Sequence, residues 1–119
     1  MTALGAFCNQ LVAFFEDLSE TYPEERDILK AAQALKLAKQ ANPRLVHRMF
    51  MENVYTDSAQ PILDEDEEYL IANAREKTNG KLDYAYWIFD KHWSAMSETN
   101  KQHVWRYMKS LILLAGRVQ

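Results

Sequence analysis

Ser97 to Gly116 reads SETNKQHVWRYMKSLILLAG, a stretch in which apolar residues recur at intervals of three and four. This spacing places the apolar side chains along one face of an α-helix. Serine is a favourable N-cap, and glycine can end a helix in the left-handed conformation. The stretch therefore predicts an amphipathic helix that docks on other helices. Its apolar face comprises Val104, Trp105, Met108, Leu111, Ile112 and Ala115.

The rest of the chain repeats the helical spacing. It predicts helices over about residues 2–19, 43–55, 64–77 and 82–93. A further helix is expected to start at a Thr21/Glu24 capping box and to run to about residue 40. Residues 56–63 are expected to form a surface loop. The first helix has a wide aromatic stripe, which suits the centre of a bundle. The second has small inner residues, which would let a neighbouring helix approach closely. The residues expected to face inward include Phe7, Cys8, Leu11, Phe14, Phe15, Leu18, Ile28, Ala31, Ala32, Leu35, Ala38, Leu45, Val46, Met49, Phe50, Val54, Tyr69 and Leu70.

Composition supports an all-α fold. A chain of 119 residues, 48% of them apolar, is long enough to bury a core without a disulfide or a metal. Three glycines and three prolines are few for a β-rich fold. We therefore expect residues 1–119 to form a single helical domain, a compact bundle of five to six helices.

The single cysteine excludes an internal disulfide and favours a reducing compartment. The start of the chain, MTALGAFCNQL, lacks the basic residues of a secretory signal. The longest apolar run, Leu111 to Ala115, is far shorter than the roughly 20 residues of a membrane span. We expect a soluble, intracellular protein that does not enter a membrane.

No catalytic, metal or cofactor site is predicted. The acidic run Asp64 to Glu68 lacks the spacing of a calcium loop and suits the positive end of a helix dipole. The histidines at 47, 92 and 103 have no second ligand at helical spacing. Cys8 falls on an apolar stripe, where a thiol is unreactive, and no glycine-rich phosphate loop is present. An enzyme would need an acid–base pair gathered from dispersed residues such as His47 and Glu52, so we expect a non-enzymatic protein.

Charge is unevenly distributed, although the net charge is only −3. Residues 28 to 51 contain five basic residues and no acid, whereas residues 52 to 68 contain seven acids and no base. Lys36, Lys39, Arg44 and Arg48 flank the Asn42-Pro43 helix start and could bind phosphate groups or a partner's carboxylates. Charges paired within the fold or exposed to solvent are the simpler interpretation.

Aromatic residues exceed what one face of two helices can hide. Trp87, Trp105 and Tyr107 are therefore candidate anchors of a protein interface. The alternative is that these rings pack against the first helix.

The segments TYPEERDI, LKLAKQANPRLV, DEDEEYL, FDKHW and NKQHVWRYMKSLILL together resemble a family of small helical proteins of large nucleocytoplasmic DNA viruses of algae and amoebae. The similarity covers nearly the whole chain and rests on hydrophobic pattern and short motifs. It implies a viral origin and a helical domain, and it supplies no activity or site residues.

These observations predict a structural or protein-interaction module that binds a protein partner or a second copy of itself. The alternative is a nucleic-acid-associated accessory factor that uses Lys36, Lys39, Arg44 and Arg48.

Overall fold

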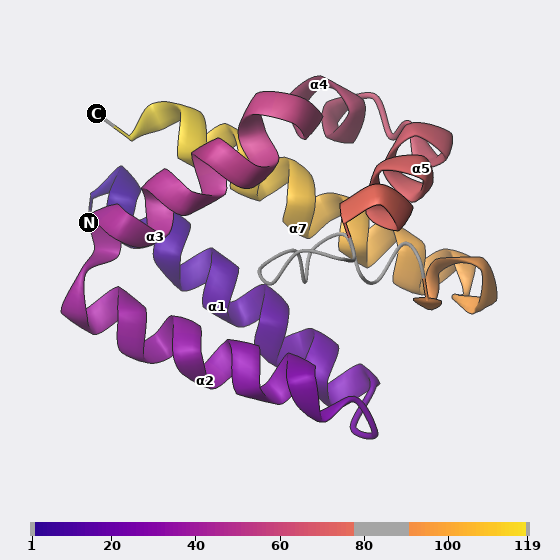
Figure 1. Ribbon diagram of the computed structural model, residues 1–119, viewed down its shortest axis with the longest axis horizontal. Helices are drawn as coiled ribbons and strands as arrows, with labels where there is room; N and C mark the ends of the chain where they lie inside the picture. The colour runs from indigo at the N-terminus through magenta and orange to yellow at the C-terminus, as the bar shows by residue number, and fades with distance from the viewer. Residues whose placement is uncertain (1, 78–90, 119) are drawn as a thin grey trace.

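Helix α1 (Ala3–Thr21) packs against α2, α3 and α7 and is the helix most completely surrounded by others (Figure 1). The computed structural model describes residues 2–77 and 91–118. Thr2 caps α1, because its Oγ1 accepts a hydrogen bond from the Gly5 N–H at 2.9 Å. The aromatic stripe expected at the centre is confirmed, since Phe7, Phe14 and Phe15 are buried.

Helices α2 (Arg26–Ala41) and α3 (Pro43–Phe50) meet at Asn42. The predicted cap is confirmed: the Asn42 side chain accepts from the Leu45 N–H, and Pro43 opens α3. The Thr21/Glu24 capping box is wrong. α1 extends to Thr21, whose hydroxyl donates to the Asp17 carbonyl at 2.9 Å, so this side chain is used at the end of α1.

The loop predicted over residues 56–63 is helical. A π-helical turn (Met51–Tyr55) joins α3 to α4 (Thr56–Leu63), and Pro61 lies inside α4. Proline removes the hydrogen bond that the Asp57 carbonyl would otherwise accept within the helix. That carbonyl instead accepts from the Tyr69 hydroxyl at 3.0 Å, so a residue distant in sequence allows the helix to continue through the proline.

Helix α5 (Glu67–Lys77) begins after a tight turn rather than at Asp64. Glu65 has φ 54°, and the N–H groups of Asp66 and Glu65 donate to the carbonyls of Pro61 and Ile62. This pattern is a Schellman motif, which ends α4 and leaves Asp66 to cap α5. Leu70 is buried as expected, whereas Tyr69 is exposed and Leu45 of α3 is borderline exposed, contrary to prediction.

A short 3₁₀ turn (Trp93–Ala95) precedes α7 (Glu98–Arg117). The Ser97 cap is confirmed, since its Oγ accepts from the Asn100 N–H, and all six predicted apolar residues of α7 are buried. Gly116 does not end the helix in the left-handed conformation. α7 continues through it to Arg117, and a Cβ at position 116 would lie 3.1 Å from the Tyr55 hydroxyl.

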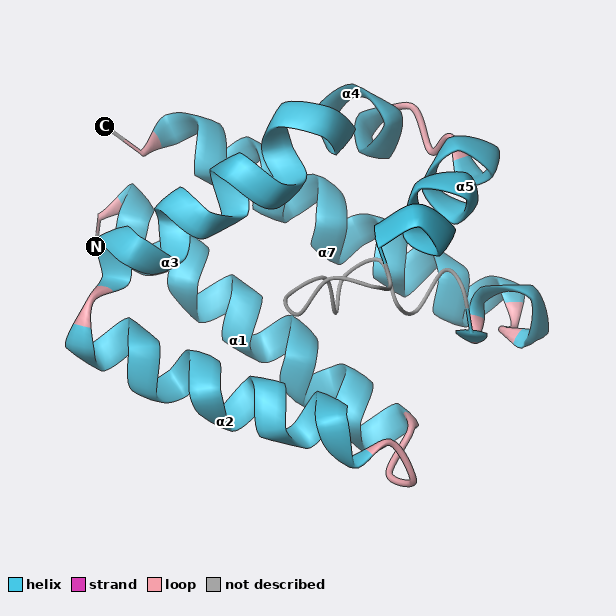
Figure 2. Ribbon diagram, viewed as in Figure 1, coloured by secondary structure: helices cyan, strands magenta, loops and turns pink. Residues whose placement is uncertain are grey.

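The all-α fold class is confirmed, because the described residues form helices and no strand (Figure 2). Their buried apolar side chains make one cluster that draws on α1, α2, α3, α4, α5 and α7. None of the helices in residues 2–77 and 91–118 combines the length and apolar character needed to cross a membrane. The predicted helix over 82–93 and the break at Asn79-Gly80 lie outside the described residues, apart from Lys91 to Trp93.

Candidate protein-interaction groove

An apolar groove with a volume of about 280 Å³ lies over α1, between α2 and α3. Figure 1 shows α1 passing between these two helices. The floor of the groove is formed by three residues of α1: Leu11, Phe14 and Phe15. One wall belongs to α2 and consists of Ala31, Ala34, Leu35 and Ala38. The opposite wall belongs to α3 and the π-helical turn and consists of Leu45, Val46, Met49, Phe50, Asn53 and Val54. Ile62, Met108 and Leu111 complete the lining.

Among the described residues that line the groove, Asn53 is the only polar one, and its side chain is already hydrogen-bonded. Its Nδ2 donates to the Met49 carbonyl at 2.8 Å. Asn53 belongs to the π-helical turn, in which the Thr56 N–H donates to the Met51 carbonyl five residues earlier. Turns of this kind occur frequently at functional sites. The groove therefore offers apolar contact and little hydrogen bonding.

Large apolar side chains border the groove. Leu37 of α2 is 69% exposed and lies one turn beyond Ala34, while Leu45 at the edge of α3 is 37% exposed. The α2 wall consists largely of alanines, which allow another backbone to approach closely. Exposed apolar surfaces of this kind occur at protein-interaction sites and in ligand-binding grooves.

The aromatic residues predicted to anchor an interface differ in their exposure. Trp105 as an exposed anchor is wrong: its side chain is 5% exposed and packs edge-on against Trp93, with ring centroids 5.3 Å apart. Tyr107 is half-buried, stacks on Phe14 at 5.2 Å and donates its hydroxyl to Asp17. That hydrogen bond, together with burial, raises the pKa of Tyr107 to about 12. Trp87 lies outside the described residues.

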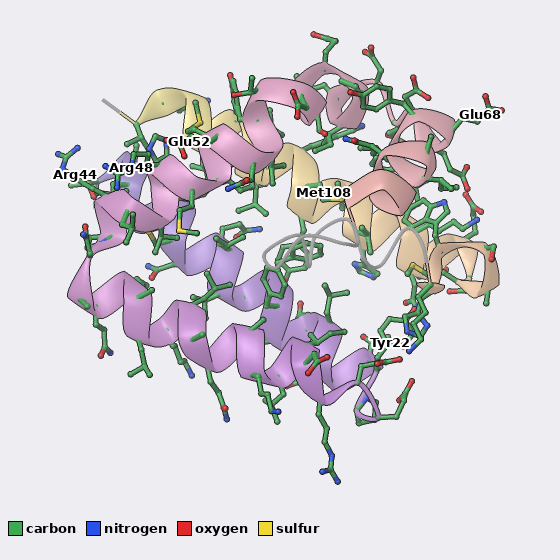
Figure 3. All side chains as sticks on the ribbon, viewed as in Figure 1. Tyr22, Arg44, Arg48, Glu52, Glu68 and Met108 are labelled. Carbon is green, nitrogen blue, oxygen red and sulfur yellow. The ribbon has the colours of Figure 1, made fainter. Side chains whose placement is uncertain are left out.

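The four predicted cationic residues do not form one patch. Lys36 is ion-paired with Glu16 of α1 at 3.1 Å, and Lys39 donates to Asn9 Oδ1 at 3.0 Å. Arg44 and Arg48 are exposed on α3, where Figure 3 shows Glu52 following them along the helix. Part of the charge is thus paired within the fold, and binding of nucleic acid stays a prediction.

A second hollow of about 310 Å³ lies between the C-terminal end of α1 and the N-terminal half of α7. Asp17, Glu20, Tyr107 and His103 line it. His103 makes no hydrogen bond to either carboxylate within the described residues, and the Tyr107 hydroxyl donates to Asp17. The hollow therefore brings polar groups together, and the Tyr107 hydroxyl is already bonded to Asp17 there.

The remaining titratable candidates have structural contacts. His47 bonds to the Ala115 carbonyl at 3.0 Å, and His92 stacks on Tyr22 at 4.2 Å. Within the described residues, no three metal-ligating side chains gather. Cys8 is buried, as expected, and burial raises the pKa of its thiol. Glu67 and Glu68 occupy the first turn of α5, where the helix dipole favours them.

Comparison with known proteins found no matching family, no similar curated protein and no similar solved structure. The viral origin implied by the sequence resemblance therefore stays an expectation.

The groove residues were not among those singled out from the sequence as partner-binding. The alanines of the second helix did signal close approach of a neighbour. The sequence does not show that α2 and α3 diverge over α1 and form a groove between them.

Proposed function

We propose that this chain is a non-enzymatic protein-interaction module whose groove between α2 and α3 receives a helix of a protein partner. The observation that carries this proposal is the apolar groove, in which every lining residue that the structure describes, except Asn53, is apolar. Burying one leucine-sized side chain in such a site contributes about 1.5–3 kcal/mol. Two or three such anchors contribute about 3–9 kcal/mol, against which the freedom lost on association has to be set.

The groove favours a helix over an extended strand. Its walls are helices whose backbone groups are hydrogen-bonded internally, so they offer no unpaired edge to a strand. Asn53, the polar residue among the described ones that line the groove, donates its side-chain amide to the Met49 carbonyl. An apolar helix stripe brings its own backbone hydrogen bonds and needs none from the groove.

Selection of displayed helical peptides on the full chain tests the proposal. Ala34 is exposed in the α2 wall, so Ala34→Gln fills the groove with little risk to folding. Ala72→Gln makes the same change on an exposed position of α5, away from the groove, and is the matched control. We expect selected peptides with apolar residues at helical spacing that bind the wild type and Ala72→Gln but lose binding to Ala34→Gln. Failure to select any peptide, or binding that Ala34→Gln leaves unchanged, would contradict the proposal.

A further inference from the structure

The hollow between α1 and α7 is a second candidate site, and it does not depend on the groove of the proposed function. Of the described residues, only Phe14 lines both. The volume of the hollow, about 310 Å³, lies at the lower end of the range of small-molecule sites, about 300–1,000 Å³. Its size therefore suits one small ligand or one long side chain.

The hollow carries negative charge that is not balanced by lysine or arginine. Asp17 and Glu20 line it, and neither forms an ion pair with another described residue. By contrast, Glu16 and Glu25 of the same acidic stretch are each paired with a lysine. The described residues that line the hollow include no lysine and no arginine. The described part of the hollow therefore attracts a cation.

The position of the two carboxylates on α1 adds to this attraction. A helix carries partial negative charge at its C-terminal end, where cations are favourable and anions are not. Glu20 lies in the last turn of α1, and that turn contains no basic residue. The folded chain thus places acids where its own helix dipole disfavours them, and a bound cation offsets that repulsion.

The rest of the lining suits a cation that has an apolar stem. Phe14, Leu18 and Val104 line the hollow and are buried, so they offer apolar surface. Tyr22 and Tyr107 are half-buried and add aromatic rings, whose faces attract cations. A strongly hydrated inorganic ion gains nothing from the apolar part of this lining, whereas an alkyl chain does.

We propose that the hollow binds an alkylammonium group, with the charge beside Asp17 and Glu20 and the alkyl chain against the apolar lining. Asp17 already accepts a hydrogen bond from the Tyr107 hydroxyl, which fixes the position of this carboxylate. The Glu20 carboxylate makes no hydrogen bond to a described residue and is the acceptor left for the ammonium group. The ligand is a free aliphatic amine or a lysine side chain of a partner.

Nuclear magnetic resonance of the full chain tests this site. His103 lines the hollow, whereas His47 bonds to the Ala115 carbonyl, about 18 Å further along α7 at a rise of about 1.5 Å per residue. The probes are putrescine, N-acetyl-lysine methylamide and, as an uncharged analogue, butanediol, all at one fixed pH. We expect both amines at millimolar concentration to shift the ring signals of His103 but not those of His47, and butanediol to shift neither.

Two matched variants test the role of the carboxylate. Glu20→Gln removes one charge at an exposed position of the hollow, so we expect both amines to bind about threefold to fivefold more weakly, as for one exposed ion pair. Glu52→Gln makes the same change elsewhere on the surface and should leave the binding unchanged. Figure 3 shows Glu52 far from Tyr22, which lies at the hollow.

Each outcome decides the proposal. Tighter binding of putrescine assigns the hollow to a free amine, tighter binding of the lysine derivative assigns it to a partner's side chain, and comparable binding shows that the alkylammonium group alone is recognised. No shift at His103, or an equal response to butanediol, would overturn the proposal. Equal weakening by Glu20→Gln and Glu52→Gln, or equally tight binding of magnesium, would also overturn it, because the attraction would then not be specific to the amine or to the hollow. None of these results bears on the groove, since Ala34 does not line the hollow.

Discussion

Gly116 and Glu65 have the reverse of the conformations that their residue types usually favour. Gly116 is helical with an ordinary φ, whereas Glu65 adopts the left-handed conformation that ends α4. The sequence pattern placed the left-handed residue at Gly116 because glycine suits it. Glycine at 116 has a different physical role: it leaves room for the Tyr55 hydroxyl, 3.1 Å from where a Cβ would lie. The Gly116 case depends on a contact with Tyr55, which is distant in sequence, whereas the Glu65 conformation belongs to the local backbone hydrogen bonds that end α4.

Substitution of Gly116 distinguishes a helix-interior glycine from a helix-ending one. Alanine is favoured over glycine inside a helix by up to about 1 kcal/mol. The Tyr55 hydroxyl is the end of a rotatable side chain and needs to move only slightly. We expect Gly116→Ala to leave the free energy of unfolding unchanged or to raise it by up to about 1 kcal/mol, measured by urea denaturation. A loss of that size would instead favour the left-handed conformation predicted from the sequence.

At the scale of elements, the helix starts were predicted well when the cap and the helix are adjacent in sequence. Asn42 and Ser97 act as expected because capping needs only a side chain and an N–H two or three residues later. The helix over 56–63 was missed because Pro61 normally interrupts a helix, and its compensation comes from Tyr69. Helical periodicity predicts most of the buried faces correctly. Tyr69 is an exception: it is predicted to face the core, but its side chain is exposed and its hydroxyl donates to the Asp57 carbonyl.

A double-mutant cycle tests whether Tyr69 compensates for Pro61. Tyr69→Phe removes the donor to the Asp57 carbonyl, and we expect a loss of about 0.5–1 kcal/mol, since this hydrogen bond is exposed. Pro61→Ala restores a backbone N–H that can donate to the same carbonyl. In that background the cost of Tyr69→Phe should therefore fall. Urea unfolding of the four proteins gives the coupling free energy. Equal costs in both backgrounds would show that the two residues act independently.

At the scale of the whole molecule, the all-α class was predictable and the groove was not. Composition and helical spacing specify which faces become buried. Whether α2 and α3 lie close enough to cover α1 depends on how Ala31, Ala34 and Ala38 pack against their neighbours. The same limit applies to Trp105, since the sequence left open whether it would be exposed, and its packing against Trp93 joins α7 to the turn before it. Sites formed between helices therefore need the three-dimensional arrangement.

Glu25 connects distant parts of the chain. It lies between α1 and α2, and its Oε1 is 2.6 Å from Lys91 Nζ and 3.2 Å from His92 Nε2. His92 in turn stacks on Tyr22, at the end of α1. The pKa of Glu25 is lowered below its ordinary value, mainly by the hydrogen bond from Lys91. Partial burial acts in the opposite direction and raises the pKa, while the hydrogen bond with His92 lowers it further. The charged form of Glu25 is therefore the form that favours the folded protein.

This linkage predicts how stability depends on pH. A carboxyl whose pKa is lowered by folding stabilises the protein above its unfolded pKa, and the effect is lost as pH falls through the folded pKa. We expect Glu25→Gln to lower the midpoint of urea unfolding at about pH 7, and we expect the difference from the wild type to shrink and then vanish as the pH falls through the lowered folded pKa of Glu25. Glu24→Gln is the matched control, because Glu24 is an exposed neighbour without an ion pair among the described residues. A difference between Glu25→Gln and the wild type that persisted at low pH would show that Glu25 acts through packing rather than through its charge.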